Sequence, residues 1–369
     1  MLAMRRCEPM RYAMAGGRWA RASLMAVAVL CPGVSGAAQS VSGDAQEEKP
    51  AFTLKAYESL MQVPALVLDS SMRPAKHRVD PGRFLVSLDS GKKFSPTNVR
   101  VEGDDPLELA IVLDVSGSQK ELVAGLAAVA AEFASALHAQ DHLSVYALDC
   151  GHLLKSADRI VPEPKAVQQA IEDVLQSPRV AKRLNEGPCP NRVLLWNAML
   201  SVVKDLHESA GRRSMLVVSD GLDEGSRITW STLHSVAGVQ GVALFGMNSL
   251  KEATGQGPDE VPDRFRALCM STGGIVLHTS SPTAGKTLTQ WVELLRGRYV
   301  IEFPRPQQMS AALHSIVISI RGDSGAFVTV AGVPVTVPSA ADLADPDRVH
   351  SDAGADIPMG NRRPLLDGH

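Results

Sequence analysis

Residues 109–118 read LAIVLDVSGS, and this stretch decides the fold of the chain. Its five leading apolar residues are typical of a strand that is buried on both faces of a sheet, and the run stops at Asp114. Apolar residues at helical spacing follow from Leu122 to Leu137, and an alternating pattern at 142–148 predicts the next strand. A strand, a helix and a second strand in this order favour parallel pairing of the strands.

The same alternation of strands and helices continues as far as residue 303. The expected elements are helices at 167–175 and 193–206, a strand at 215–218, a strand at 239–245, a helix at 262–271, a strand at 275–278, a helix at 288–295 and a strand at 298–303. We therefore expect an α/β fold across residues 105–303, in which a doubly wound, mostly parallel sheet carries helices on both faces.

Shorter strand patterns flank this region on both sides. Residues 51–104 and 304–337 contain short apolar runs between turns, so each stretch is expected to form a small β segment. The first of them would be marginal alone and is expected to pack on the region that follows. A polar, acidic stretch at 39–50 is predicted to be a linker. The last residues, 338–369, contain few apolar side chains and are expected to be disordered.

The first 38 residues carry the features of a secretory signal peptide. They hold five arginines and one acid, an apolar run at 24–34, and four small residues before a cleavage site expected near Ala38. The apolar run is too short to cross a bilayer, which takes ~20 residues. Cys31 would permit lipidation, but Leu30 stands where a small residue should precede a lipidated cysteine. We therefore expect an exported protein, periplasmic or secreted, with no transmembrane segment.

The composition of the whole chain excludes several classes of protein. Its 369 residues are 45% hydrophobic and 21% charged, which excludes a wholly disordered, collagen-like or polytopic membrane protein. The net charge is −3 and aromatic residues make up 4%, so the chain lacks the basic surface and the stacking side chains of a nucleic-acid binder. A nucleic acid is therefore not expected among its partners.

The candidate site lies where the first buried strand gives way to a helix. Asp114, Ser116 and Ser118 occupy alternate positions there, and a second carboxylate, Asp220, follows the strand at 215–218. Ligands of doubly wound sheets bind at the carboxyl ends of the strands, so these side chains are expected at one edge. Carboxylate and hydroxyl oxygens are the ligands that Mg²⁺ prefers. Taken alone, each motif has a simpler interpretation, since Asp-x-Ser can cap a helix and Asp-Gly can form a turn.

Together these motifs resemble the metal-ion-dependent adhesion site of von Willebrand factor type A (VWA) domains. DVSGS at 114–118 and SDG at 219–221 are similar to two parts of that site, LWNA at 195–198 is similar to the LYDA segment of bacterial members, and TGG at 272–274 matches a later motif. Over residues 55–335 the chain resembles exported VWFA-related proteins first noted in acidobacteria. The resemblance implies a Rossmann-like VWA fold and an adhesion module that binds a protein partner, with Mg²⁺ or another divalent cation as its cofactor.

One position departs from the family pattern. Val193 stands where the resemblance implies a threonine as the third direct metal ligand, and a valine methyl group has no lone pair to donate. Asn191 or Asn197 could take its place as an oxygen ligand. Without such a substitute the site is degenerate, weakened or vestigial. The alternative function is then a structural or assembly protein of the cell envelope.

Three cysteines remain after the predicted signal peptide. Cys269 lies in an apolar helical pattern and is expected to be a buried thiol. Cys150 follows the strand at 142–148, and Cys189 precedes the helix that would carry the missing threonine. The VWA resemblance therefore implies that both lie near the metal edge. We expect a disulfide between them, which an oxidising compartment would preserve.

Motifs for catalysis are weak throughout the chain. Gly285-Lys286-Thr287 imitates the end of a phosphate-binding loop, but Ser280 stands where its first glycine should be. No Gly-x-Ser-x-Gly motif is present, and the histidines are scattered singly. Ser116 has no His and acid pair placed by sequence to activate it as a nucleophile. We therefore expect a binding module and not an enzyme.

Overall fold

The central sheet of the computed structural model has its strands in the order β6-β5-β4-β7-β8-β9. These strands are β4 (Leu107–Asp114), β5 (His142–Asp149), β6 (His152–Ile160), β7 (Arg212–Val218), β8 (Ala243–Ser249) and β9 (Val276–Thr279). All neighbours pair in parallel except β6, which is antiparallel to β5. This order confirms the expected α/β fold with a doubly wound, mostly parallel sheet.

Only part of the chain is described by the structure. The described residues are 60–70, 73, 75, 77–117, 119–186, 189, 192–207, 212–249, 263–305, 312–323, 325–336 and 355–356. They all belong to one unit, which begins at Lys55. The predicted signal peptide at 1–38, the predicted linker at 39–50 and the predicted ligand Ser118 lie outside these ranges. Within them, no helix combines the length and hydropathy needed to cross a bilayer.

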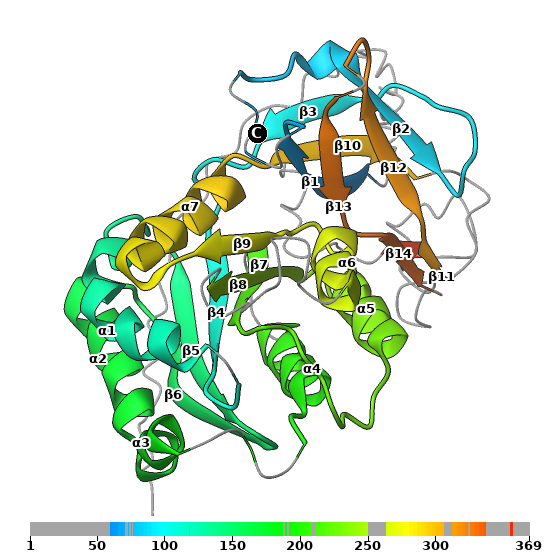
Figure 1. The fold of residues 1–369 in the computed structure, drawn as a ribbon. Coiled ribbons are helices and arrows are strands. Elements are labelled where there is room, and N and C mark those ends of the chain that lie inside the picture. The colour runs from blue at the N-terminus through cyan, green and yellow to red at the C-terminus, as the bar shows by residue number, and fades with distance from the viewer. Residues whose placement is uncertain are drawn as a thin grey trace, which may run out of the picture. The chain divides into compact units, whose positions relative to one another are not determined.

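Helices cover both faces of the central sheet (Figure 1). On one face lie α1 (Lys120–Ala134), α2 (Pro164–Gln176) and α7 (Ala284–Arg296), and on the other lie α4 (Leu195–His207), α5 (Trp230–Val239) and α6 (Asp263–Ser271). The short helix α3 (Pro178–Asn185) follows α2. Every residue of β4 is buried, because its side chains alternate between the core under α1 and the core under α4.

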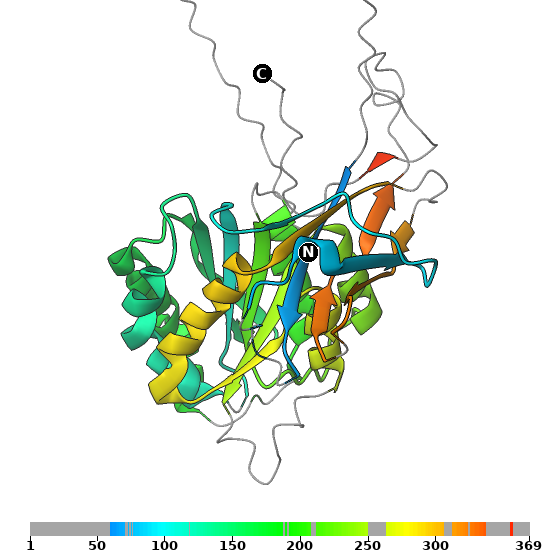
Figure 2. The ribbon, with the colours of Figure 1, turned by 90° about the horizontal axis from the view of Figure 1, so that it is seen from above.

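A separate core lies between two smaller sheets, which we call the flanking sheets. Their strand orders are β13-β1-β10-β3 and β12-β2. The strands are β1 (Leu60–Leu68), β2 (Phe84–Leu88), β3 (Asn98–Val101), β10 (Tyr299–Pro304), β12 (Ile316–Ile320) and β13 (Phe327–Val330). Figure 2 shows the blue strand β1 beside the orange strand β13, which comes from near the other end of the chain. Apolar side chains of both sheets, such as Val63 and Phe84, fill the space between them.

The remaining described elements are short. They are the 3-10 helices η1 (Pro81–Arg83) and η2 (Ser281–Thr283) and the strands β11 (Ala312–His314), β14 (Val333–Thr336) and β15 (Ala355–Asp356). β15 pairs with β14, so two residues of the tail at 338–369 form a strand where disorder was expected. The rest of that tail lies outside the described residues.

The strand β10 belongs to a different sheet from the one expected. The alternation that continues to residue 303 predicts that the strand at 298–303 joins the central sheet, but β10 pairs with β1 and β3. Its apolar residues Ile301 and Phe303 are buried in the core of the flanking sheets. The doubly wound part therefore ends with α7.

Some elements have no clear signal in the sequence. β6 reads HLLKSADRI and is only partly buried, since it is the antiparallel edge strand. Its charged side chains discourage further pairing. α3 and α5 were also not predicted. The strand predicted at 239–245 begins only at Ala243, because Val239 is still the last residue of α5.

Candidate functional site

The carboxyl ends of β4 and β7 lie next to each other at one edge of the central sheet. Leu113 pairs with Val218 in the parallel register. The residues that follow them, Asp114 and Ser219, are therefore neighbours. The motifs at 114–117 and 219–221 therefore meet at this edge. We refer to the following four described residues as the carboxyl-edge site: Asp114, Ser116, Ser219 and Asp220.

Asp114 is held by two hydroxyl groups and one amide. Its Oδ1 accepts hydrogen bonds from the backbone N–H of Ser116, at 2.9 Å, and from the Oγ of the same serine. Its Oδ2 accepts a hydrogen bond from the Oγ of Ser219 at 2.7 Å. The exposed fractions of Asp114, Ser116 and Ser219 are 2%, 2% and 0%. This buried carboxylate is therefore satisfied by neutral donors.

The electrostatics of this edge disfavour a second negative charge. Burial raises the pKa of Asp114, hydrogen bonds from Ser116 and Ser219 lower it, and the charge of Asp220 raises it again. The net shift is upward. A divalent cation between the two carboxylates would remove the repulsion and favour the ionised form of both.

Asp220 reaches across to the loop that follows β4. Its Oδ1 accepts a hydrogen bond from the backbone N–H of Leu222 at 3.0 Å, and a Cβ placed on Gly117 would lie 2.9 Å from its Oδ2. Gly221 has φ of +81°, and a Cβ there would lie 2.5 Å from the ring of Phe265. Both motifs therefore need their glycines, one for close approach and one for a left-handed turn.

The side chain of Val193 has no oxygen that could bind a cation at this edge. Its side chain is 8% exposed and packs in the apolar cluster beneath α4. Its carbonyl accepts a hydrogen bond from the N–H of Glu224 at 3.1 Å, while the N–H of Leu194 donates to the carbonyl of Cys150 at 3.0 Å. The segment before α4 is thus fixed between the end of β5 and the loop that follows β7.

Asn197 does not take the place of the missing threonine. Its Oδ1 accepts hydrogen bonds from the backbone N–H groups of Arg227 and Ile228, at 3.2 and 3.3 Å. The amide oxygen is therefore committed to the loop before α5. The other suggested substitute, Asn191, lies outside the described residues, as does Ser118.

Two side chains that the sequence motifs missed hold the loops of this edge in place. Asp223 accepts hydrogen bonds from the N–H of Trp196, at 3.0 Å, and from the Oγ of Ser226, at 2.6 Å, and thereby caps the first turn of α4. Gln119 is 3% exposed and accepts a hydrogen bond from the N–H of Ser249 at 2.7 Å. A helix-capping aspartate is a recognisable signal, but its partner helix here comes earlier in the chain.

The disulfide between Cys150 and Cys189 is present, as expected from the resemblance. It ties the end of β5 to the segment before α4, and the two cysteines are 39 positions apart in the sequence. Together with Asp149 these cysteines form a compact group of metal-ligand types, but the disulfide occupies both sulfurs. Asp149 pairs instead with Arg179 and Arg183, at 2.8 and 2.7 Å.

Cys269 is the buried thiol that its apolar pattern predicts. Its exposed fraction is 0% and it forms no disulfide. Burial raises the pKa of this thiol, which favours its protonated form.

Comparisons with known proteins find similarity in structure only. No family model and no curated protein sequence matches the chain. Proximal thread matrix protein 1 from the mussel byssus matches with a TM-score of 0.39 and 11% identity, over 56% of this chain and 50% of that chain. The same protein with its MIDAS motif occupied by zinc has a TM-score of 0.39 and 14% identity, over 53% and 49%.

A von Willebrand factor type A protein from Catenulispora acidiphila is also similar. It matches with a TM-score of 0.38 and 10% identity, over 75% of this chain and 74% of that chain. The present chain spans about half the length of the mussel protein. Similarities this distant decide nothing about function, which has to be sought in the residues of the site.

Proposed function

We propose that this chain is an exported, non-enzymatic binding module of the VWA type that engages a protein partner at the carboxyl edge of its central sheet. Asp114, Ser116, Ser118 and Asp220 would hold a divalent cation there, and a carboxylate of the partner would complete its shell. One observation carries the proposal: two carboxylates and a serine hydroxyl meet at the ends of neighbouring buried strands.

The donor set suits a hard cation of the Mg²⁺ type. All the groups are oxygens, and Mg²⁺ characteristically keeps several waters in its shell besides one or two carboxylates. The Oγ of Ser116 donates a hydrogen bond to Asp114, so the lone pairs of this Oγ are left for a cation. The cation would supply a positive charge that a partner carboxylate can bind. The protein residues would position that charge at the edge of a rigid sheet.

Val193 favours a second function, in which the metal site is vestigial. Its side chain packs among apolar residues, so the position that should supply a third protein oxygen supplies none. The chain would then be a structural or assembly protein of the cell envelope, and the flanking sheets would make the contacts.

Isothermal titration calorimetry of the mature chain with Mg²⁺, Mn²⁺ and Ca²⁺ separates the two functions. We expect one weak site in the wild type and none in the Asp114→Asn/Asp220→Asn variant. Val193→Thr restores a ligand oxygen and should tighten binding at least tenfold. Asp158→Asn is the matched control, because this carboxylate is exposed on β6 and pairs with Lys155. If no ion binds and Val193→Thr gains nothing, the metal-bridged function is wrong and the vestigial one is favoured.

Partner binding is tested by capture from envelope extract with and without a chelator. The metal-bridged function predicts a partner that the wild type retains only without chelator, and that the Asp114→Ala/Asp220→Ala variant does not retain. Capture that neither chelator nor the substitutions change would place the binding surface elsewhere.

Export is supported by the disulfide, because disulfides persist in oxidising compartments. The proposal predicts that the mature protein begins close to residue 39. N-terminal sequencing of protein from the periplasm or the medium checks this expectation, and an intact N-terminus on protein that stays in the cytoplasm would contradict it.

A further inference from the structure

A hollow lined by arginines lies at the opposite, amino edge of the central sheet. It is small, with about 20 Å³ of space for the centre of a water-sized sphere. Arg212 and Arg213 at the start of β7 line it, as do Arg298 just before β10 and Thr272 after α6. No acidic residue is among its described lining residues.

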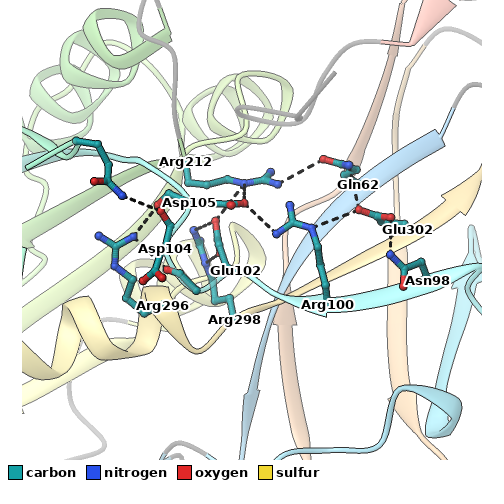
Figure 3. Close-up of polar contacts among 12 residues, drawn as sticks. Gln62, Asn98, Arg100, Glu102, Asp104, Asp105, Arg212, Arg296, Arg298 and Glu302 are labelled. Carbon is teal, nitrogen blue, oxygen red and sulfur yellow. Dashed lines mark hydrogen bonds and ion pairs between the residues drawn. The ribbon is translucent and has the colours of Figure 1, made fainter. Parts of the chain in front are cut away.

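The acids of this edge lie behind the arginines. Figure 3 shows the guanidinium groups of Arg212 and Arg298 directed at Glu102. Arg298 binds both oxygens of Glu102, at 2.7 and 3.1 Å, and the Nε of Arg212 lies 3.2 Å from the same carboxylate. Arg100 pairs with Asp105 at 2.9 Å. We call these five residues the amino-edge cluster: Arg100, Glu102, Asp105, Arg212 and Arg298.

Arg212 has a donor that the cluster leaves without a partner. Its side chain is 2% exposed, its Nε faces Glu102 and its Nη2 donates to the Oε1 of Gln62 at 3.4 Å. Its Nη1 is buried and has no hydrogen-bond partner among the described residues. Arg213 is 7% exposed, and its Nε is also buried without a hydrogen-bond partner among the described residues. Buried charged donors normally have a partner, because leaving one unpaired is costly.

The unpartnered guanidinium donors at the hollow suit an anion. Burial lowers the pKa of Arg212, the charge of Glu102 raises it, and the charges of Arg298 and Arg100 lower it. Guanidinium groups bind oxyanions through several N–H groups at once. About 10–15 Å³ of such space holds one water, so the hollow excludes organic ligands and admits only a small ion.

We propose that this hollow is a binding site for a small oxyanion of the phosphate or sulfate class, held by Arg212, Arg213 and Arg298. Its lining comes from both parts of the unit, since Pro64 and Arg298 adjoin the flanking sheet and Arg212 and Thr272 belong to the doubly wound part. A bound anion therefore joins the two parts and stabilises the folded chain by mass action. The site is independent of the carboxyl-edge site, because Arg212 begins β7 and Asp220 follows its other end.

Thermal unfolding and calorimetry of the mature chain in sodium phosphate or sodium sulfate test the site, with sodium chloride at equal ionic strength as reference. We expect a saturable rise in Tm for both oxyanions, absent in chloride, and one binding site per chain. Arg212→Lys keeps the charge but loses the forked donor, so it should weaken binding at least tenfold. Arg213→Lys is the second variant, for use if Arg212→Lys does not fold. Arg100→Lys is the matched control within the cluster and should bind within twofold of the wild type.

Two results would overturn the site. One is a Tm that rises no more in the oxyanions than in chloride, which would leave only an effect of ionic strength. The other is oxyanion binding of wild-type strength in every folded variant at Arg212 and Arg213. Loss of binding in Asp114→Asn/Asp220→Asn would also contradict the proposed independence of the two edges.

Discussion

The two edges of the central sheet differ in the groups that surround their buried carboxylates. At the carboxyl edge, Asp114 is bonded to neutral groups and is repelled by Asp220. At the amino edge, Glu102 is equally buried, but two guanidinium groups neutralise it. The amino edge is thus an ion-paired joint between two parts of the fold. The carboxyl edge instead holds a buried carboxylate, Asp114, through neutral donors beside a second carboxylate, Asp220.

Removing the acid of the amino edge should have the largest effect on stability. Glu102→Gln leaves the buried guanidinium groups of Arg212 and Arg298 without their shared carboxylate, and breaking such a buried pair costs ~3–5 kcal/mol. Urea unfolding followed by circular dichroism measures the loss. A loss below ~1 kcal/mol would show that the cluster does not hold the flanking sheets to the central sheet.

The disulfide near the carboxyl edge should have the next largest effect. Cys150→Ser/Cys189→Ser opens a loop that the disulfide closes over 39 positions, which lowers the free energy of unfolding by about 3–4 kcal/mol in the chain-entropy model. The same unfolding measurement on the wild type, with and without reductant, provides the control. Equal midpoints for oxidised and reduced wild type would contradict the expected contribution.

Neutralising Asp114 should have the smallest effect on stability and so sharpens the contrast with Glu102. Asp114→Asn removes a buried charge that has a carboxylate as neighbour, so the lost hydrogen-bond strength is offset by a smaller desolvation cost. We expect the free energy of unfolding without metal to change by less than ~1 kcal/mol. A loss as large as that of Glu102→Gln would mean that both edges are structural.

The carboxyl edge could be predicted from the sequence because its signals are local. A continuous apolar run ending in Asp114, and a second run followed by Asp220, suffice to bring the two acids together once the strands are parallel. The apolar packing of Val193 also agrees with its residue type. The hydrogen bond between Asn197 and the loop before α5 could not be predicted from the sequence, because it depends on the path of the chain after β7.

The amino edge could not be predicted, because its contacts are long-range. Glu102 and Arg298 are 196 positions apart, and neither lies in a motif. They meet only because β10 joins β1 and β3, and the apolar alternation of β10 would suit either sheet. An arginine in a sequence also carries no sign of whether it will be buried, since exposure is the usual state of this residue.

The central claim is a cation between Asp114 and Asp220, and the most direct measurement is anomalous diffraction from crystals of the mature chain grown with Mn²⁺. We expect one strong peak between the two carboxylates, beside the Oγ of Ser116, and a stronger one in Val193→Thr. Crystals that bind Mn²⁺ elsewhere but show no peak at this edge, in the wild type or in Val193→Thr, would contradict it.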